Sequence, residues 1–212
     1  MPTNVCRNVG LPRGGLYAVS DGPRTDLLGA CEKALAGGAV LLQYRDKTVE
    51  HGRRREEASA LAALCVRYRV PLIVNDDIEL AASVVAAGVH LGERDATVAG
   101  ARSRLGAKAI IGVSCYNSID RARQAASDGA DYLAFGAFYP SPTKPNAFRA
   151  APDLLRAAKA LGLPLVAIGG ITPDNAQLLL ESGADFLAVV SGVFGGADPA
   201  AAARRYAALF TK

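Results

Sequence analysis

Short apolar runs alternate with Ala-rich segments of helical period along almost the whole chain. This alternation is typical of a parallel α/β fold, because parallel strands are joined by crossover helices. Helical segments fill the gaps between the runs, and the last of them extends from about 199 to 209. We expect strands at 15–20, 39–45, 71–76, 88–91, 109–115, 132–138, 164–170 and 186–190.

Eight parallel strands in a chain of 212 residues favour one lean (β/α)8 TIM barrel over residues 15–212. Residues 1–14 are polar and broken by Pro and Gly, and we expect a mobile tail there. The alternative is an open doubly wound sheet. The first strand, GLYAVSDGP, lacks the G-x-G-x-x-G pattern of a dinucleotide site, which weakens that alternative.

A glycine recurs where a helix gives way to the next strand, at Gly38, Gly88, Gly129 and Gly183. Glycine suits the left-handed turn that ends a helix. The spacing therefore indicates paired βα units rather than a short solenoid repeat.

Charge and cysteine content limit the classes of function. The net charge of +4 and pI of about 9.0 are too mildly basic to require nucleic acid, and no aromatic platform accompanies the basic residues. The four cysteines form no CxxC pair, which disfavours disulfides and a zinc site. The start has no apolar core of a secretory signal, and no apolar stretch reaches about 18 residues, the length of a membrane span. We expect a cytoplasmic protein with no membrane or nucleic-acid partner; a homodimer is compatible with the sequence.

The second strand ends in Gln43-Tyr44-Arg45-Asp46-Lys47. Gln43, Arg45 and Lys47 share one parity, so they point the same way if the extended pairing persists that far. An amide and two cations at the C-terminal mouth of a barrel suit a phosphate-rich ligand. The alternative is a loop cation that pairs with Asp46 or Glu50.

Acids follow the third and fourth strands. Asp76 and Asp77 come after Asn75, and Asp95 lies just past the next strand. Such acids could share one Mg²⁺, which prefers oxygen ligands and often bridges to substrate phosphates. The alternative for Asp76 and Asp77 is N-capping of the helix expected at 78–86.

Other polar residues in the strands have simpler interpretations. His90 lies inside an apolar strand and is expected to be packed and hydrogen-bonded, whereas His51 opens a helix and is expected to be exposed. Ser114 can donate to a phosphate or a heterocycle. Cys115 has no evident activating base, so we expect a buried structural thiol.

The sixth and the last two strands lead into candidate anion sites. Ser141, Thr143 and Lys144 on a proline-stiffened loop suit anion capture, and the loop position disfavours a Schiff-base lysine. Barrels frequently bind phosphate after strands 7 and 8. Gly169 and Gly170 permit close backbone approach, and Ser191 is expected to cap a short helical turn facing the phosphate, unless the glycines only form a turn.

Taken in order, the segments QYRDK, VNDDIELA, AGVHLGERD, IGVSCYN, GADYLAFGAFYPSPTK, PLVAIGGI and AVVSGVF resemble the thiamine-phosphate synthase family from about Tyr17 to Phe194. The PSPTK loop together with AIGGI is distinctive, whereas the GG element alone is shared by many phosphate-binding barrels. The resemblance implies a transferase that joins a hydroxymethylpyrimidine diphosphate to a hydroxyethylthiazole phosphate and releases pyrophosphate and thiamine phosphate.

The resemblance also implies roles for individual residues. The pyrimidine diphosphate would be held by Gln43, Tyr44, Arg45, Asp46, Lys47, Asn75, Ser114 and Lys144. Of these, Arg45, Lys47, Ser114 and Lys144 would act in catalysis. One Mg²⁺ would be held by Asp76 and Asp95. The thiazole phosphate would be surrounded by Ser141, Pro142, Thr143, Gly170, Val190 and Ser191.

The implied chemistry agrees with the residues present. Loss of pyrophosphate leaves a pyrimidine carbocation that the thiazole nitrogen attacks, so the reaction needs charge stabilisation and alignment more than a general base. Three positions depart from the family's frequent forms: Asp77 for arginine, Glu93 for glutamine and Tyr116 for histidine. Two rivals remain: a tautomerase acting on the thiazole phosphate alone, and a non-catalytic protein that binds phosphorylated ligands.

Overall fold

The computed structural model describes residues 10–93, 95–140 and 149–211. Within these ranges, eight parallel strands form a closed barrel in which each strand pairs with its neighbours in sequence and β8 pairs with β1. The (β/α)8 barrel expected from the sequence is therefore confirmed. The strands are β1 Gly15–Val19, β2 Ala39–Tyr44, β3 Leu72–Asn75, β4 Gly88–Leu91, β5 Ile110–Tyr116, β6 Tyr132–Phe135, β7 Leu165–Ile168 and β8 Phe186–Val189.

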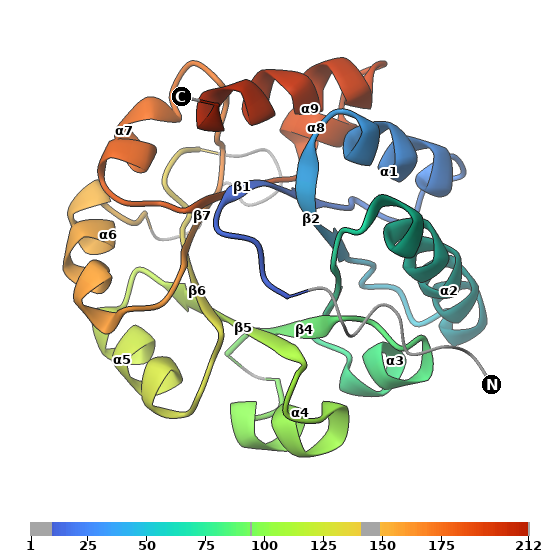
Figure 1. Ribbon diagram of the computed structural model, residues 1–212, viewed down its shortest axis with the longest axis horizontal. Helices are drawn as coiled ribbons and strands as arrows, with labels where there is room; N and C mark the ends of the chain where they lie inside the picture. The colour runs from blue at the N-terminus through green and yellow to red at the C-terminus, as the bar shows by residue number, and fades with distance from the viewer. Residues whose placement is uncertain (1–9, 94, 141–148, 212) are drawn as a thin grey trace.

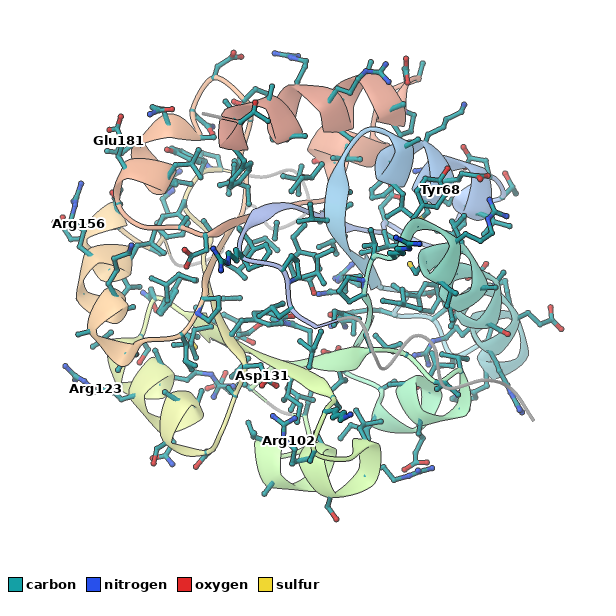
Figure 2. All side chains as sticks on the ribbon, in the orientation of Figure 1. Tyr68, Arg102, Arg123, Asp131, Arg156 and Glu181 are labelled. Atoms are coloured by element: carbon teal, nitrogen blue, oxygen red, sulfur yellow. The ribbon has the colours of Figure 1, made fainter. Side chains whose placement is uncertain are left out.

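Helices surround the barrel as an outer ring, and the labelled charged residues Arg123, Arg156 and Glu181 project outward from it (Figures 1 and 2). Two helices follow β8, a short α8 and then α9, which packs beside α1. In the described ranges the α-helices are α1 Leu27–Ala36, α2 His51–Tyr68, α3 Ile78–Ser83, α4 Val98–Leu105, α5 Ile119–Ser127, α6 Pro152–Ala158, α7 Gln177–Glu181, α8 Ser191–Phe194 and α9 Pro199–Ala207. No helix in the described part of the chain is long and apolar enough to cross a membrane.

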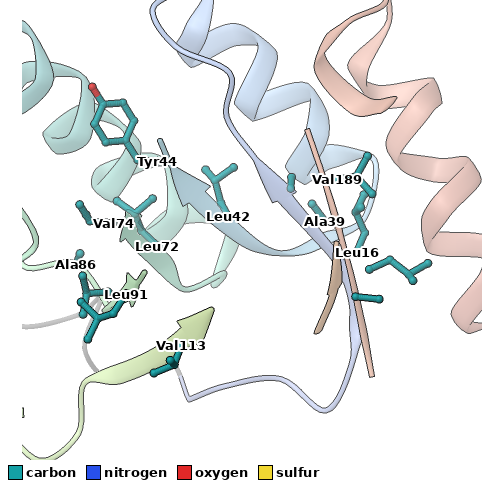
Figure 3. Packing of buried hydrophobic residues seen from close by; sticks show 14 of the residues in the cluster. Leu16, Ala39, Leu42, Tyr44, Leu72, Val74, Ala86, Leu91, Val113 and Val189 are labelled. Atoms are coloured by element: carbon teal, nitrogen blue, oxygen red, sulfur yellow. The ribbon is translucent and has the colours of Figure 1, made fainter. Parts of the chain in front are cut away.

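The strands have two apolar faces, and each face belongs to a different core. Side chains of one parity, such as Leu16, Leu42 and Leu72, pack between the strands and the helices (Figure 3). Side chains of the other parity fill the barrel: Tyr17, Val19, Leu41, Ile73, Ala87, Ile110, Tyr132, Ala134, Val166, Phe186 and Ala188. A run buried on both faces explains why the strands are apolar throughout rather than alternating.

The N-terminal end of the barrel is covered by the chain that leads into β1. Leu11 packs against the cluster inside the barrel, and the mobile tail over residues 1–14 stays a prediction. Residues 1–9 lie outside the described residues.

Most strands end one to three residues before the expected boundary, and β5 runs one residue past it. The glycine pattern is confirmed at Gly38, Gly129 and Gly183, which have φ values of 100°, 87° and 106°. Gly88 is an exception: the left-handed residue there is Val85, and Gly88 begins β4. A Cβ at Gly88 would lie 1.8 Å from the Ile110 carbonyl oxygen, so close strand packing excludes a side chain at this position.

Candidate active site

The C-terminal ends of β2, β3 and β4 bring a cation and two acids together. Lys47 follows β2, and its Nζ lies 3.2 Å from Oδ2 of Asp76, the residue after β3. Asp76 has a φ of 62°, and its N–H donates to the His90 carbonyl at 2.8 Å, which ties this tip to β4. The left-handed conformation turns the chain between the strand and α3.

Asp95 forms the second half of the acidic pair. Its Oδ2 accepts the Gly92 N–H at 2.6 Å, and a Cβ at Gly92 would lie only 2.8 Å from that oxygen. Burial, together with a hydrogen bond and repulsion from the Asp95 carboxylate, raises the pKa of Asp76, while Lys47 acts in the opposite direction. The fold therefore holds two carboxylates together against their mutual repulsion, as expected of a cation site.

The acidic pair fits the ligand chemistry of Mg²⁺. Two carboxylates supply hard oxygen donors, and Mg²⁺ commonly binds to one or two carboxylates and completes its shell with water and substrate phosphate. Among the described residues, no cluster of three or more His, Cys, Asp or Glu could form an all-protein metal cage. The donor set therefore suits an ion that is shared with a phosphorylated ligand.

Asp77 does not face this pair. Its Oδ1 accepts the Leu80 N–H at 2.8 Å and caps α3, while its Oδ2 pairs with Arg54 of α2 at 3.0 Å. Of the two acids after β3, Asp77 is therefore the N-cap of α3, whereas Asp76 pairs with Lys47 at the C-terminal ends of the strands.

The loop after β2 is organised differently from the sequence expectation. Pairing ends at Tyr44, so the parity argument does not extend to Arg45 and Lys47. Ser20 instead holds the backbone of Arg45, whose N–H donates to the Ser20 hydroxyl at 2.8 Å. Part of the ordering of this loop therefore comes from Ser20, which directly follows β1 and is 25 residues away in sequence.

The side chains of Asp46 and Tyr44 pair with α2, and their contact with a substrate stays a prediction. The fully buried Asp46 side chain accepts the Thr48 N–H at 2.8 Å and pairs with Arg53 of α2 at 2.7 Å. Burial alone would raise the pKa of Asp46, but these hydrogen bonds hold it below its ordinary value. The Tyr44 hydroxyl donates to Glu57 of α2 at 2.7 Å. Both residues fasten the loop to α2.

Gln43 and Asn75 belong to the inner face. Gln43 is buried, and its Nε2 donates to the Tyr17 hydroxyl at 2.7 Å. Asn75 lies two residues after Ile73, which packs inside the barrel, so Asn75 has the same inward parity at the tip of β3. Both amides therefore belong to the layer beneath the mouth.

Ser114 and His90 are joined on the inner face. The Ser114 Oγ lies 2.8 Å from Nε2 of His90, whose Nδ1 lies 2.9 Å from the Tyr132 hydroxyl. The packed, hydrogen-bonded histidine expected at this position is confirmed, and His51 is exposed at the start of α2 as expected. Cys115 is buried, which raises the pKa of its thiol to about 12 and confirms an inert structural residue.

The loops after β6, β7 and β8 meet at the other side of the mouth. A Cβ at Gly170 would lie 2.3 Å from the Pro140 carbonyl oxygen, and one at Gly169 would lie 2.4 Å from Cβ of Ala137. The two glycines therefore let the β7 loop pack directly on the chain that follows β6. Ser141, Pro142, Thr143 and Lys144 lie outside the described residues.

The expected cap at Ser191 is wrong. The N-cap of α8 is Val190, and exposed Ser191 is the first helical residue, with no side-chain capping bond. Val190 is half-buried and packs against the cluster inside the barrel. The Ser191 hydroxyl thus does not cap α8. Separately, the Tyr206 hydroxyl of α9 donates to the Ile171 carbonyl at 2.9 Å and so connects α9 to the loop after β7.

Sequence reasoning did not identify the buried tyrosines Tyr17 and Tyr132 as part of the site. Both lie on inward positions of their strands, with hydroxyls 2.9 Å apart inside the barrel. The alternation of side chains along each expected strand could have indicated that these two tyrosines point into the barrel, as Leu41 and Ile73 do. By contrast, the links from Ser20 to Arg45 and from Arg53 to Asp46 depend on packing between segments and leave no local pattern.

The chain is similar in sequence and in fold to named proteins. The chain is 54% identical over 187 residues to a thiamine-phosphate synthase of Marinobacter nauticus, covering 87% of this chain and 84% of the relative. It is also 54% identical over 199 residues to one of Xanthomonas campestris, covering 93% and 96%. A solved structure of thiamine phosphate pyrophosphorylase from Pyrococcus furiosus superposes with a TM-score of 0.84 at 32% identity, covering 92% of this chain and 94% of that one.

The barrel alone does not define the activity. A 3-hexulose-6-phosphate synthase superposes with a TM-score of 0.73 at only 19% identity, which shows a shared fold and nothing more. The family model described as thiamine monophosphate synthase, in contrast, matches residues 16–193, a span that includes every strand tip discussed above. On sequence, fold and strand-tip residues together, the chain belongs to the thiamine monophosphate synthase family.

Proposed function

We propose that this barrel synthesises thiamine phosphate by joining hydroxymethylpyrimidine diphosphate to hydroxyethylthiazole phosphate with release of pyrophosphate. Membership of the family and 54% identity to thiamine-phosphate synthases support this activity. The observation that carries the site assignment is the convergence of Lys47, Asp76 and Asp95 at adjoining strand ends. A tautomerase acting on the thiazole phosphate would not need this diphosphate and metal side of the mouth.

We assign the diphosphate to the side of the mouth formed after β2 and β3. Lys47, which pairs with Asp76, and Arg45, two residues before it, would supply positive charge there, and Asp76 with Asp95 would hold one Mg²⁺. When bound, this ion would neutralise charge on the diphosphate oxygens and so assist departure of the leaving group. Lys144 would add a further cation from the loop after β6.

The pyrimidine ring would lie over the inner polar layer. Gln43, Asn75 and Ser114 are inward residues at or near strand tips, and they provide both donors and acceptors for a heterocycle. Asp46 and Tyr44 contribute indirectly, because they fasten the loop that carries Arg45 and Lys47. In this arrangement the inward polar side chains would lie below the pyrimidine ring, and the charged residues of the loop after β2 would lie beside its diphosphate.

The thiazole phosphate would bind across the mouth, where the β7 and β8 loops meet. Gly170 and Val190 would supply backbone N–H groups and Ser191 a hydroxyl, together with Ser141, Pro142 and Thr143 from the preceding loop. This placement would put the two substrates on opposite sides of one mouth. The thiazole nitrogen could then approach the methylene carbon in line with the departing diphosphate.

In the proposed reaction the bond between the pyrimidine methylene carbon and the diphosphate oxygen breaks first, and its electron pair leaves with pyrophosphate. The thiazole nitrogen then donates its lone pair to the resulting carbocation and becomes the thiazolium nitrogen of thiamine phosphate. Neither step transfers a proton from the thiazole, so the reaction needs no general base. The site's contribution is alignment and charge stabilisation.

A direct assay tests this proposal. Purified protein is mixed with both substrates and Mg²⁺, with and without a chelator, and thiamine phosphate and pyrophosphate are quantified. We expect both products in equal amounts, and none in the presence of the chelator. A folded protein that binds the thiazole phosphate but forms neither product would instead favour the tautomerase or a binding role.

A further inference from the structure

Five side chains form one hydrogen-bonded chain across the inside of the barrel. Gln43 Nε2 lies 2.7 Å from the Tyr17 hydroxyl, which lies 2.9 Å from the Tyr132 hydroxyl. The Tyr132 hydroxyl lies 2.9 Å from His90 Nδ1, and His90 Nε2 lies 2.8 Å from Ser114 Oγ. These hydrogen bonds therefore connect two of the residues assigned to the pyrimidine, Gln43 and Ser114, through three residues with no assigned role.

The barrel is shaped to accommodate this chain. Strand pairing aligns His90 of β4 with Gly112 of β5, and Gly112 in turn with Tyr132 of β6. A Cβ at Gly112 would lie 1.9 Å from the Tyr132 ring, so only glycine leaves room for that ring. The ring also stacks on His90 at an interplanar angle of 18°. These contacts hold Tyr132 and His90 in one arrangement.

Counting protons gives the chain a direction. The Gln43 amide nitrogen can only donate, so the Tyr17 oxygen accepts from it. Either tyrosine can donate in the next bond, and the polarity in which Tyr17 donates to Tyr132 gives both phenolic hydrogens an acceptor within the barrel. With that polarity Tyr132 donates to His90 Nδ1, and a neutral imidazole would carry its single proton on Nε2 and donate it to Ser114. Burial raises the pKa of both tyrosines, so both phenols keep the hydrogens that this count requires.

The last member of the chain faces the mouth. With that polarity Ser114 Oγ accepts from His90, so the Ser114 hydroxyl hydrogen is left for donation to another group. In the opposite polarity Ser114 would donate to His90 and could offer a ligand only lone pairs. The polarity of a chain that begins at Gln43 thus decides whether Ser114 is a donor or an acceptor for the substrate.

We propose that Tyr17, Tyr132 and His90 are positioning residues that hold His90 as its Nε2–H tautomer and thereby make Ser114 a hydrogen-bond donor to the pyrimidine diphosphate. The acceptor on that substrate is either a ring nitrogen or a diphosphate oxygen. This inference rests on the proposed function for the identity of the substrate. The tautomer itself is a property of the free protein.

The kinetic test compares Tyr132→Phe with Tyr206→Phe. Loss of the Tyr132 hydroxyl frees His90 to take the other tautomer, so we expect the KM for the pyrimidine diphosphate to rise on the order of tenfold. The KM for the thiazole phosphate should stay unchanged. Tyr206→Phe removes another buried phenolic hydrogen bond, outside the chain, and should lower Tm without changing the KM for the pyrimidine diphosphate. Equal changes in both KM values for Tyr132→Phe would overturn the proposal.

Substitution of His90 gives a second kinetic comparison. His90→Gln can keep an N–H donor toward Ser114, whereas His90→Leu cannot. We expect His90→Gln to recover most of the KM increase that His90→Leu causes. Equal KM values for the two variants, in proteins that are both folded, would show that the donor at this position is not needed.

Two inhibitors identify the acceptor atom. In Ser114→Ala, weaker inhibition by inorganic pyrophosphate would identify a diphosphate oxygen as the acceptor. Unchanged inhibition by pyrophosphate, combined with lost discrimination against a substrate whose ring nitrogen is replaced by C–H, would identify the ring. If Ser114→Ala affects neither, Ser114 is not a donor to this substrate and the proposal fails.

Nitrogen NMR on labelled protein without substrates separates this inference from the proposed function. We expect the His90 signal to report a proton on Nε2 in the wild type and a shift toward the Nδ1–H tautomer in Tyr132→Phe. A wild-type Nδ1–H tautomer would overturn the chain polarity even in an active enzyme. Failure to form thiamine phosphate with the Nε2–H tautomer intact would refute the proposed substrate instead.

Discussion

Asp76→Asn should separate the stability of the barrel from its chemistry. The substitution keeps the size and polarity of the side chain but removes one of two carboxylates that repel each other. It also removes the ion pair with Lys47, which is largely exposed and whose Nζ lies 3.2 Å from Asp76. The two electrostatic changes have opposite signs for the free energy of unfolding.

The expected magnitudes differ by more than measurement error. An exposed ion pair contributes about 0.2–1 kcal/mol. Relief of the repulsion from Asp95 offsets part of that loss, so Tm should change by no more than about 2–4 °C. A group that stabilises charge developing in the transition state contributes far more, about 10²–10³-fold in kcat. We therefore expect a folded protein of near-normal stability whose Mg²⁺-dependent turnover is lower by that factor.

Asp77→Ala is the matched control. Asp77 adjoins Asp76 in sequence, but its carboxylate caps α3 and pairs with Arg54. Its loss should reduce the free energy of unfolding by about 1 kcal/mol through the cap, with turnover changed little. Thermal unfolding and steady-state assays over a Mg²⁺ titration measure both effects. Normal turnover in Asp76→Asn, or a loss of turnover confined to Asp77→Ala, would refute the metal assignment.

Three further predictions concern other parts of the molecule. Ser191→Ala should raise the KM for the thiazole phosphate several-fold by removing one hydroxyl donor, about 1 kcal/mol, and an unchanged KM would argue against that subsite. Asp46→Ala should lower Tm and raise the KM for the pyrimidine diphosphate, because the Thr48 N–H and Arg53 lose their buried partner; Tm and KM are measured on the same preparation, and a fall in Tm without a change in KM would contradict the positioning role. Burial raises the pKa of the Cys31 and Cys115 thiols from 9.0 to about 12. Above pH 9 these thiols therefore ionise first in the unfolded state, and the free energy of unfolding measured with urea should fall toward pH 12, less steeply in the double alanine variant. Equal slopes of the free energy of unfolding against pH in the two proteins would show that these thiols are not responsible.

The barrel could be predicted from sequence because strands buried on both faces leave continuous apolar runs. The same property explains the errors at strand ends. An apolar run does not distinguish the last paired residue from the first loop residue, so β2 was extended to Arg45 and β6 to Phe138. After β6 the backbone still donates from Phe138 to Ile168 at 3.2 Å and from Tyr139 to Gly169 at 3.0 Å, but the segment no longer forms a regular strand.

The site could be predicted only where residue type and strand position were both informative. The proximity of Asp76 and Asp95 could be predicted, since acids at adjoining strand ends converge in a barrel, whereas their binding of a cation stays a prediction. Tyr44 and Asp46 did not meet that condition, because they lie between Gln43 and Lys47 in one motif and yet face α2. Neighbouring residues of a motif look like one site in the sequence. In the structure, however, successive side chains of a strand point to opposite faces, and the turn after the strand redirects the residues that follow.

The inner face of the barrel changes character along its axis, and this gradient explains why the polar chain lies where it does. Near the N-terminal end the inward residues are apolar, with Leu41, Ile73 and Phe186 buried and Leu11 packed against them. One layer higher the inward positions are Gln43 and His90, which still lie below the mouth and are nearly excluded from water. Polar groups at that depth must satisfy one another, and phenols that reach across the barrel allow them to do so. We therefore expect substitutions of Tyr17, Tyr132 and His90, which lie below the mouth, to alter substrate recognition without contacting the substrate.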